Sequence, residues 1–185
     1  MIKFGKRISG GMEKLSVVYF DTPLGRMVAG STVQGIALLG FADEGDGTLK
    51  RDRSAQGMEM QEEQTPLLER LRRELGEYFA GSRVSFDLPL APAGTPFERR
   101  AWDALAAVPY GETRSYGEQA AAMGRPGAVR AVARANGRNP VVILIPCHRI
   151  IGSDGRLTGF TGGLWRKKWL LAHEAVHGGR GDRLF

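Results

Sequence analysis

The residues best suited to chemistry stand together in Pro146-Cys147-His148-Arg149, which contains the single cysteine of the 185-residue chain. A thiolate is a strong nucleophile, and a neighbouring base or positive charge favours its formation. A lone cysteine is more often buried packing than a reactive group. Successive side chains of an extended strand point to opposite faces. For Cys147 and His148 to cooperate, the backbone must therefore turn at Pro146-Cys147, or a water must bridge the two side chains.

A histidine base also needs an acidic partner that fixes its tautomer. Glu174, in the last predicted helix, is our candidate, whereas His173 and His177 are expected to be ordinary surface residues. The run 140–144 before the cysteine has no polar side chain, and the loop 152–163 after it is rich in glycine. A reactive group between a rigid element and a loop is a common arrangement in active sites.

Length and composition indicate a globular protein of one domain or two small ones. No apolar run approaches the roughly 20 residues of a membrane span, and the basic N-terminus is not followed by the apolar segment of a signal peptide. One cysteine excludes an internal disulfide and a cysteine-rich zinc site. We therefore expect a cytoplasmic protein with no membrane partner and no metal site.

The net charge of +6 is distributed unevenly along the chain. Residues 96–185 carry 14 Lys/Arg and 7 Asp/Glu, whereas residues 1–95 carry 12 and 13. A basic half is typical of proteins that neutralise phosphates. The alternative is ordinary charge that keeps the protein in solution.

The first half predicts a small sheet. Three short β-like runs separated by turn signals predict an antiparallel meander at residues 15–20, 27–30 and 36–41. The polar, mixed-charge stretch 42–64 predicts a surface loop, and residues 84–88 predict a last strand.

A helix lies between that loop and the last strand. Thr65 and Pro66 are typical of an N-cap and a first helical residue, and Gly81 closes an apolar pattern of helical period. The stretch 91–95 is predicted to be a linker and marks a boundary between domains. The predicted organisation is a poorly ordered extension at 1–11, an α/β domain at 12–94 and a helical domain at 95–185.

The second half predicts mainly helices. Thr95 with Glu98 and Ser115 with Glu118 are two capping boxes. The helix that begins at Ser115 ends near Gly124, and a further helix is expected at 126–135. Two short helices across a tight glycine turn have the spacing of a helix-turn-helix.

The second of these helices has a thin basic face. Arg130 and Arg134 are i,i+4 neighbours, and Val129, Val132 and Ala133 are expected to point inward. Such a face suits a DNA-recognition helix, and an exposed helix with two solvated arginines is the alternative. In the last helix, residues 164–175, the charged run 166–168 predicts a solvated face. The residues expected in its core are Trp165, Trp169, Leu170 and Leu171.

Several motifs together resemble the O6-alkylguanine-DNA alkyltransferases. Pro146-Cys147-His148-Arg149-Ile150 is similar to the Pro-Cys-His-Arg-Val signature of that family. The resemblance covers residues 95–174 in order and spacing, and the first half only in general layout. The other motifs that carry it are Pro109-Tyr110-Gly111-Glu112-Thr113-Arg114-Ser115-Tyr116, Arg130-Ala131-Val132, Asn136-Gly137-Arg138-Asn139-Pro140 and Leu170-Leu171-Ala172-His173-Glu174.

The resemblance implies an α+β fold: a ribonuclease H-like α/β domain with an antiparallel sheet, then a helical domain with a helix-turn-helix. It also implies single-turnover repair of double-stranded DNA, approached from the minor-groove side by a monomer without a cofactor. The flipped base would be O6-alkylguanine, and O4-alkylthymine besides. Cys147 would take the alkyl group, His148 would deprotonate Cys147 through a water, and Glu174 would orient His148.

The remaining roles come from the same resemblance. Tyr116 would assist extrusion and donate a proton to the leaving guanine, Asn139 would hold the turn of the cysteine, and Arg130 would fill the vacated space in the duplex. The other residues expected at the DNA are Ala128, Ala131, Arg134, Ala135 and Gly137. Those expected at the base are Ile150, Phe160, Thr161 and Tyr116.

Phe160 and Thr161 depart from the residues common in that family, which leaves the width of the alkyl pocket open, and Ala133 stands where glycine is usual. The principal alternative function is a non-catalytic sensor of alkylated DNA. A cysteine hydrolase that uses Cys147 and His148, and a helix-turn-helix transcription regulator, are further alternatives.

Overall fold

The computed structural model describes residues 14–42 and 58–178. The predicted extension at 1–11 and most of the predicted loop at 42–64 lie outside the described residues. The chain divides into two compact units between Gly94 and Thr95. None of the helices in the described ranges combines the length and the apolar character that crossing a membrane requires.

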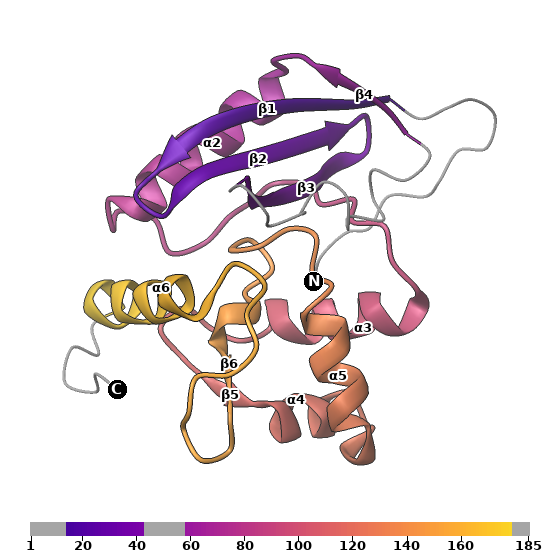
Figure 1. Cartoon of the computed structure of the whole chain (residues 1–185), viewed down its shortest axis with the longest axis vertical. Helices are drawn as coiled ribbons and strands as arrows, with labels where there is room; N and C mark the ends of the chain where they lie inside the picture. The colour runs from indigo at the N-terminus through magenta and orange to yellow at the C-terminus, as the bar shows by residue number, and fades with distance from the viewer. Residues whose placement is uncertain (1–13, 43–57, 179–185) are drawn as a thin grey trace. The chain divides into compact units, whose positions relative to one another are not determined.

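The first unit is built on a four-stranded sheet of order β3-β2-β1-β4 (Figure 1). β1 (Lys14–Thr22), β2 (Gly25–Thr32) and β3 (Gly35–Phe41) pair antiparallel, so the predicted meander is confirmed. β4 (Glu59–Glu62) pairs parallel to β1. Its four residues are all exposed, as expected of an edge strand protected by charge.

Two predictions for this unit are wrong. The stretch 42–64 is not entirely loop, because β4 lies within it. Residues 84–88 form no strand, and the pairing seen just after them is an isolated bridge between Ile36 and Leu90. Pro89 lacks the backbone N–H that a regular β-ladder needs. The segment pairs with the edge of β3 through only two hydrogen bonds, from the Ile36 N–H to the Pro89 carbonyl and from the Ala91 N–H to the Ile36 carbonyl.

α2 (Pro66–Phe79) covers the sheet by packing on β2 and β3. The Thr65 hydroxyl accepts a hydrogen bond from the Leu68 N–H at 3.2 Å, which confirms the predicted N-cap. The apolar face that α2 buries consists of Leu68, Leu71, Leu75 and Tyr78.

The second unit is helical. α3 (Pro96–Ala106) and α4 (Tyr116–Ala122) each begin with the predicted capping box, in which the side chain and backbone of the N-cap both bond to residue N3. A 3₁₀ turn, η1 (Pro126–Ala128), then leads into α5 (Val129–Asn136). The three helices share a cluster of Ala101, Ala120, Met123, Val132 and Ala135.

A buried amide pair joins α4 to α5. Gln119 and Asn136 exchange two hydrogen bonds at 3.1 and 2.7 Å, and Gln119 also donates to the carbonyl of Ala101. The positive φ of Gly124 turns the chain between the two helices. Because every polar atom of a buried amide must find a partner, this exchange fixes the relative placement of α4 and α5.

The remaining elements of this unit close around the cysteine motif. β5 (Arg114–Ser115) pairs parallel with β6 (Ile150–Ile151), which directly follows the turn η2 (Cys147–Arg149). α6 (Leu164–His177) packs on η2. Its predicted core is partly wrong, because Trp165 is 56% exposed. His173 is likewise not a surface residue, since it is buried and stacks on the ring of Trp169 at 4.8 Å.

Two glycines of the first unit make a matched test of this packing. Gly76 lies inside α2, where an added methyl group would meet no described atom within 4 Å, whereas a Cβ on Gly35 would clash with the Pro89 carbonyl oxygen. We expect Gly76→Ala to raise the free energy of unfolding by about 0.5–1 kcal/mol, because it lowers the entropy of the unfolded chain. Gly35→Ala should lower it by roughly 1–3 kcal/mol, since its φ of +148° is also unsuitable for alanine. Urea unfolding measures both, and a destabilised Gly76→Ala protein would contradict the packing of α2.

Candidate active site

The backbone turns at Pro146-Cys147, which is one of the two arrangements that the sequence left open for cooperation between Cys147 and His148. Pro146 has φ −83° and ψ 63°, and the Cys147 N–H bonds back to the Ile145 carbonyl at 2.9 Å, which together define an inverse γ-turn. The Arg149 N–H then bonds to the Pro146 carbonyl at 3.0 Å within η2. Cys147 and His148 are thus placed by a helical turn rather than on opposite faces of a strand.

The segment before this turn is itself tightly folded. Ile143 has a φ of +72°, and it lies between the Leu144 N–H and the Val142 carbonyl, which bond at 2.9 Å. A second bond joins the Ile145 N–H to the Val141 carbonyl at 3.0 Å. A β-branched residue at positive φ costs on the order of 1–3 kcal/mol and persists only where its surroundings impose it. The apolar run 140–144 therefore forms a strained, buried turn rather than a strand.

Asn139 ties this turn to the thiol. Its side-chain N–H groups donate to the Ile145 carbonyl at 2.7 Å and to the Cys147 Sγ at 3.2 Å. Its side-chain oxygen accepts from the Val141 N–H at 3.0 Å. One amide thus fixes the position of Sγ and gives it a hydrogen-bond donor, which favours a thiolate when one forms.

The thiol of Cys147 is protonated at rest. Only 7% of the residue is exposed, and this burial raises the pKa of the thiol. The Asn139 hydrogen bond and the positive charge of Lys167 lower that pKa, but they do not overcome burial. Nucleophilic attack from this site therefore requires a base.

His148 has the form of a neutral base. It is fully buried, and burial lowers the pKa of its imidazole even though Glu174 opposes the shift. Nε2 lies 2.9 Å from Glu174 Oε1 and must be the donor, because the carboxylate only accepts. Nδ1 is buried and has no hydrogen-bond partner among the described residues. The lone pair of Nδ1 can therefore accept a proton, and the imidazole is not bonded directly to Sγ.

Glu174 is the charged centre of the site. Besides His148, it accepts hydrogen bonds from the Gly111 N–H at 3.1 Å and from the Arg149 guanidinium at 2.8 and 3.0 Å. Burial raises the pKa of the carboxyl, but the interactions with His148 and with the Arg149 guanidinium outweigh burial and hold that pKa well below its usual range. The sequence suggested Arg149 only as a source of positive charge, whereas it is the ion-pair partner of Glu174.

Tyr116 faces the loop 152–163. Its hydroxyl donates to the Thr158 carbonyl at 3.2 Å, and burial raises the pKa of the phenol. A side chain on Gly159, whose φ is +52°, would approach that hydroxyl to 3.0 Å, so glycine permits the contact.

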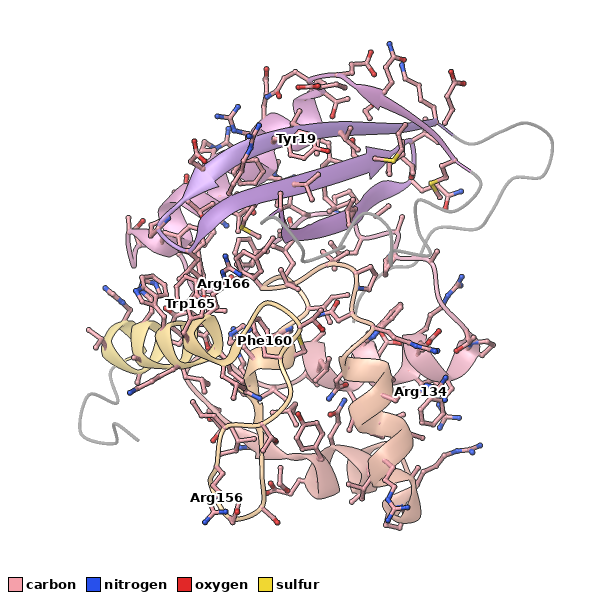
Figure 2. The ribbon with its side chains drawn as sticks, in the orientation of Figure 1. Tyr19, Arg134, Arg156, Phe160, Trp165 and Arg166 are labelled. Carbon is pink, nitrogen blue, oxygen red and sulfur yellow. The ribbon has the colours of Figure 1, made fainter. Side chains whose placement is uncertain are left out.

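Farther along the same loop lie two residues predicted to contact the base. Phe160 is half-buried, and Figure 2 shows it on the loop that leads into α6. Thr161 is exposed, and its hydroxyl donates to the carbonyl of Gly137 at 3.0 Å, which joins the loop to the end of α5.

Lys167 is a site residue that the sequence did not suggest. The run 166–168 is not a solvated face, because Arg166 and Lys167 are 6% and 0% exposed. Lys167 Nζ donates to the carbonyls of Ile150 at 2.5 Å and Thr158 at 2.6 Å. The pattern of charged and apolar residues gave no sign that Lys167 is buried, because the carbonyls that accept its hydrogen bonds are distant in the sequence. The carbonyl of Ile150, a residue expected at the base, therefore already accepts one hydrogen bond.

The predicted DNA face lies on α5. Arg130, Ala131 and Arg134 are exposed, and Figure 2 shows Arg134 projecting from this helix. With α3 they border a groove of about 410 Å³. Gly137 is exposed and Ala128 is half-buried.

Two residues of this helix are not exposed or buried as the sequence led us to expect. Val129 was expected to point inward but is 37% exposed. Ala135 is 2% exposed and packs in the cluster between the helices, so it offers DNA almost no side-chain surface. The helix turns by 3.6 residues, which places Ala135 with Val132 rather than with Arg134.

Comparison with known proteins identifies both units. Residues 17–92 match the profile of the 6-O-methylguanine DNA methyltransferase ribonuclease-like domain, and residues 96–176 match the profile of its DNA-binding domain. A methylated-DNA–protein-cysteine methyltransferase of Methanosarcina acetivorans is 41% identical over 84% of this chain and 95% of its own length. One from Mycolicibacterium paratuberculosis is 58% identical over 56% of this chain, and there the match spans less than two thirds of the relative, 63%.

Solved structures agree with these matches. The Mycobacterium tuberculosis OGT in complex with DNA superposes with a TM-score of 0.76 at 38% identity, covering 88% of this chain and 94% of that one. An O6-methylguanine methyltransferase from the same organism gives 0.73 at 36% identity, covering 88% and 94%. The predicted α+β fold is confirmed.

The ionised state of Glu174 predicts a specific loss of stability in acid. Because its folded pKa lies below the unfolded value of about 4.3, its contribution is complete above that value and is lost as the pH falls toward the folded pKa. Glu174→Gln should lower the free energy of unfolding by about 3–5 kcal/mol at pH 7, because Arg149 stays buried without its counter-charge. The variant should also lose less stability than the wild type between pH 5 and about 3.

Urea unfolding as a function of pH measures this difference, with Glu118→Gln as the control. Glu118 caps α4 at the surface and its pKa is also lowered, but it carries no buried cation. Parallel stability curves for wild type and Glu174→Gln would contradict the electrostatic role of Glu174.

Proposed function

The chain belongs to the 6-O-methylguanine DNA methyltransferase family, and we propose that it repairs DNA by moving the alkyl group of O6-alkylguanine onto Cys147. One arrangement of side chains carries the proposal. Asn139 donates a hydrogen bond to the Cys147 thiol, and the adjacent His148 is neutral, with its Nε2 hydrogen-bonded to Glu174. The same displacement would serve O4-alkylthymine. The proposed substrate is double-stranded DNA, bound from the minor-groove side by a monomer.

The chemistry follows from the protonation states. His148 Nδ1 takes the thiol proton through a bridging water, and the imidazolium that forms is stabilised by the carboxylate of Glu174. The thiolate attacks the alkyl carbon in line, so an S–C bond forms while the C–O6 bond breaks and its electron pair passes to guanine. Tyr116 donates a proton to the departing guanine and regains one from solvent, and the imidazolium of His148 releases the proton that it took from the thiol to solvent. No cofactor is needed for this displacement.

The reaction consumes the protein. A thioether has no leaving group that a neutral imidazole can activate, so Cys147 is not regenerated and each molecule acts once. Damage sensing without transfer is the alternative, and it would leave Cys147 unmodified.

DNA engagement is assigned to the helix-turn-helix. Exposed arginines and small side chains on α5 support close approach to a phosphate backbone. Arg130 would occupy the space that the flipped base leaves, which lowers the cost of unstacking. Tyr116, at the start of α4, would meet the extruded base.

The covalent step has a direct readout. After incubation with duplex DNA containing O6-methylguanine, intact-mass analysis should show one added CH2 unit per protein, and peptide mapping should place it on Cys147. Cys147→Ala should show no adduct while binding the duplex with an affinity within about threefold of the wild type, since the substitution removes no phosphate contact. Tight binding of the damaged duplex by the wild type without any adduct would favour the sensor and overturn the proposal.

The role of Arg130 is separable from the chemistry. Arg130→Ala should slow repair of O6-methylguanine in duplex DNA by about 100-fold, because the unstacking cost of a few kcal/mol is no longer offset. Its reaction with the free base O6-benzylguanine should stay within about twofold of the wild type. Arg134→Ala is the control on the same helix, expected to weaken duplex binding and its salt dependence without this selectivity. Equal losses on duplex and free base would remove Arg130 from this role.

A further inference from the structure

The groove of about 410 Å³ between α3 and α5, here called the α3–α5 groove, is lined by an arginine to which the proposed function gives no role, Arg138. Resting on that function, we propose that Arg138 binds a backbone phosphate of the duplex in this groove and that Glu98 is the residue that positions Arg138. The contact sets the register of the damaged strand relative to Cys147.

The charge of the α3–α5 groove suits an anion. Arg130, Arg134 and Arg138 line it at intervals of four residues, so their side chains follow one side of α5 and continue just past its end. Glu98 is the one carboxylate among the residues that line the groove, which leaves an excess of two positive charges. Thr95, the N-cap of α3, also lines the groove, and the dipole of a helix favours negative charge at that end.

Glu98 holds the guanidinium of Arg138 in place. The Glu98 side chain is 6% exposed, and its Oε1 accepts a hydrogen bond from Arg138 Nη1 at 2.9 Å. Its Oε2 accepts from the Thr95 N–H at 2.8 Å, so both oxygens of the carboxylate are used. Burial raises the pKa of this carboxyl, but the hydrogen bonds from the Thr95 backbone and from Arg138 outweigh burial and lower that pKa. The carboxylate is therefore ionised at neutral pH and anchors a cation beside the groove.

Arg138 keeps donors for a second acceptor. Its side chain is 37% exposed, and the bond to Glu98 is made through Nη1 of a planar group that carries five N–H donors. A guanidinium that a carboxylate holds on one edge can present its other edge to the oxygens of a phosphate. The ammonium of a lysine has no such second edge.

Arg138 is also connected directly to the nucleophile. The Arg138 N–H bonds to the Ala135 carbonyl at 3.1 Å, so Arg138 continues the last turn of α5. The next residue, Asn139, bonds to the Asn136 carbonyl in the same way, and its side chain donates to Cys147 Sγ at 3.2 Å. A phosphate bound by Arg138 is thus held at a set position relative to the thiol. Phosphate contacts are the ones that fix the register of a protein on a duplex.

The first test measures the phosphate contact on the full chain. Arg138→Gln should reduce the slope of log Kd against log salt concentration on undamaged duplex DNA by about 0.9, the value for one phosphate contact. Arg73→Gln is the control, because it removes the same charge from an exposed position on α2, and its slope should equal that of the wild type. A wild-type slope in Arg138→Gln would overturn the contact.

The second test separates positioning from charge. In Glu98→Gln the single side-chain oxygen cannot both cap Thr95 and hold Arg138, because the NH2 group does not accept hydrogen bonds. Loss of a negative charge should tighten duplex binding by up to about threefold. Single-turnover repair at saturating O6-methylguanine duplex should nevertheless fall by about 10-fold, because the damaged strand is no longer held in register.

Glu118→Gln is the matched control for this variant. It makes the same change of charge in the capping box of α4, where the carboxylate accepts from Ser115 and from no arginine of the described residues. Its repair rate at saturation should equal that of the wild type. Equal rates for Glu98→Gln and Glu118→Gln would overturn the positioning role.

Reaction with the free base O6-benzylguanine shows whether the Cys147 turn is intact. Because the free base has no phosphate, Glu98→Gln and Arg138→Gln should react with it within about twofold of the wild type. Equal losses on duplex and free base would mean that the substitutions disturb the thiol itself, and would overturn the proposal.

Two further outcomes are kept distinct. Should Arg138→Gln fail to fold because Glu98 loses its cation, the double variant Glu98→Gln/Arg138→Gln replaces the ion pair by two amides, and a wild-type salt slope there would overturn the contact. Wild-type protein that binds the damaged duplex but never takes its methyl group would sink the proposed function. The salt slopes are measured on undamaged DNA, so they would still test the contact of Arg138.

Discussion

A single buried carboxylate organises the catalytic unit. Glu174 accepts hydrogen bonds from the Gly111 backbone, from the imidazole of His148 and from two nitrogens of the Arg149 fork. Leaving any of these donors unpaired in the interior would cost about 1–3 kcal/mol, and more for a charged one. The carboxylate therefore fixes α6, η2 and the loop after α3 relative to one another before any substrate arrives.

Burial sets the resting protonation states of the groups around that charge. It lowers the pKa of the His148 imidazole against the opposing effect of Glu174, and it raises the pKa of the Cys147 thiol, so the imidazole is neutral and the thiol is protonated at rest. In the proposed mechanism, a thiolate and an imidazolium would form only during the reaction, and Asn139 and Lys167 would stabilise the thiolate while Glu174 stabilises the imidazolium. Preorganised dipoles and charges of this kind need no rearrangement in the transition state.

Local patterns in the sequence were sufficient for the capped helices and the three-stranded meander, because each depends on neighbours within a few residues. These local patterns were not sufficient where a residue distant in the sequence determines the structure. Lys167 is buried because of carbonyls 17 and 9 residues away, and residues 84–88 lack a ladder because Pro89 limits the pairing beside β3. β4 was not predicted, because a charged and fully exposed edge strand lacks the alternation of apolar and polar residues that indicates a strand.

The amide exchange between Gln119 and Asn136 has a mechanical consequence. It joins the helix that begins with Tyr116 to the helix that carries Arg130, so the backbones of the two helices are held together at a buried contact. If Arg130 fills the space left by the base and Tyr116 meets the extruded base, as proposed, the two events would be mechanically coupled, because a displacement of one helix would move the other.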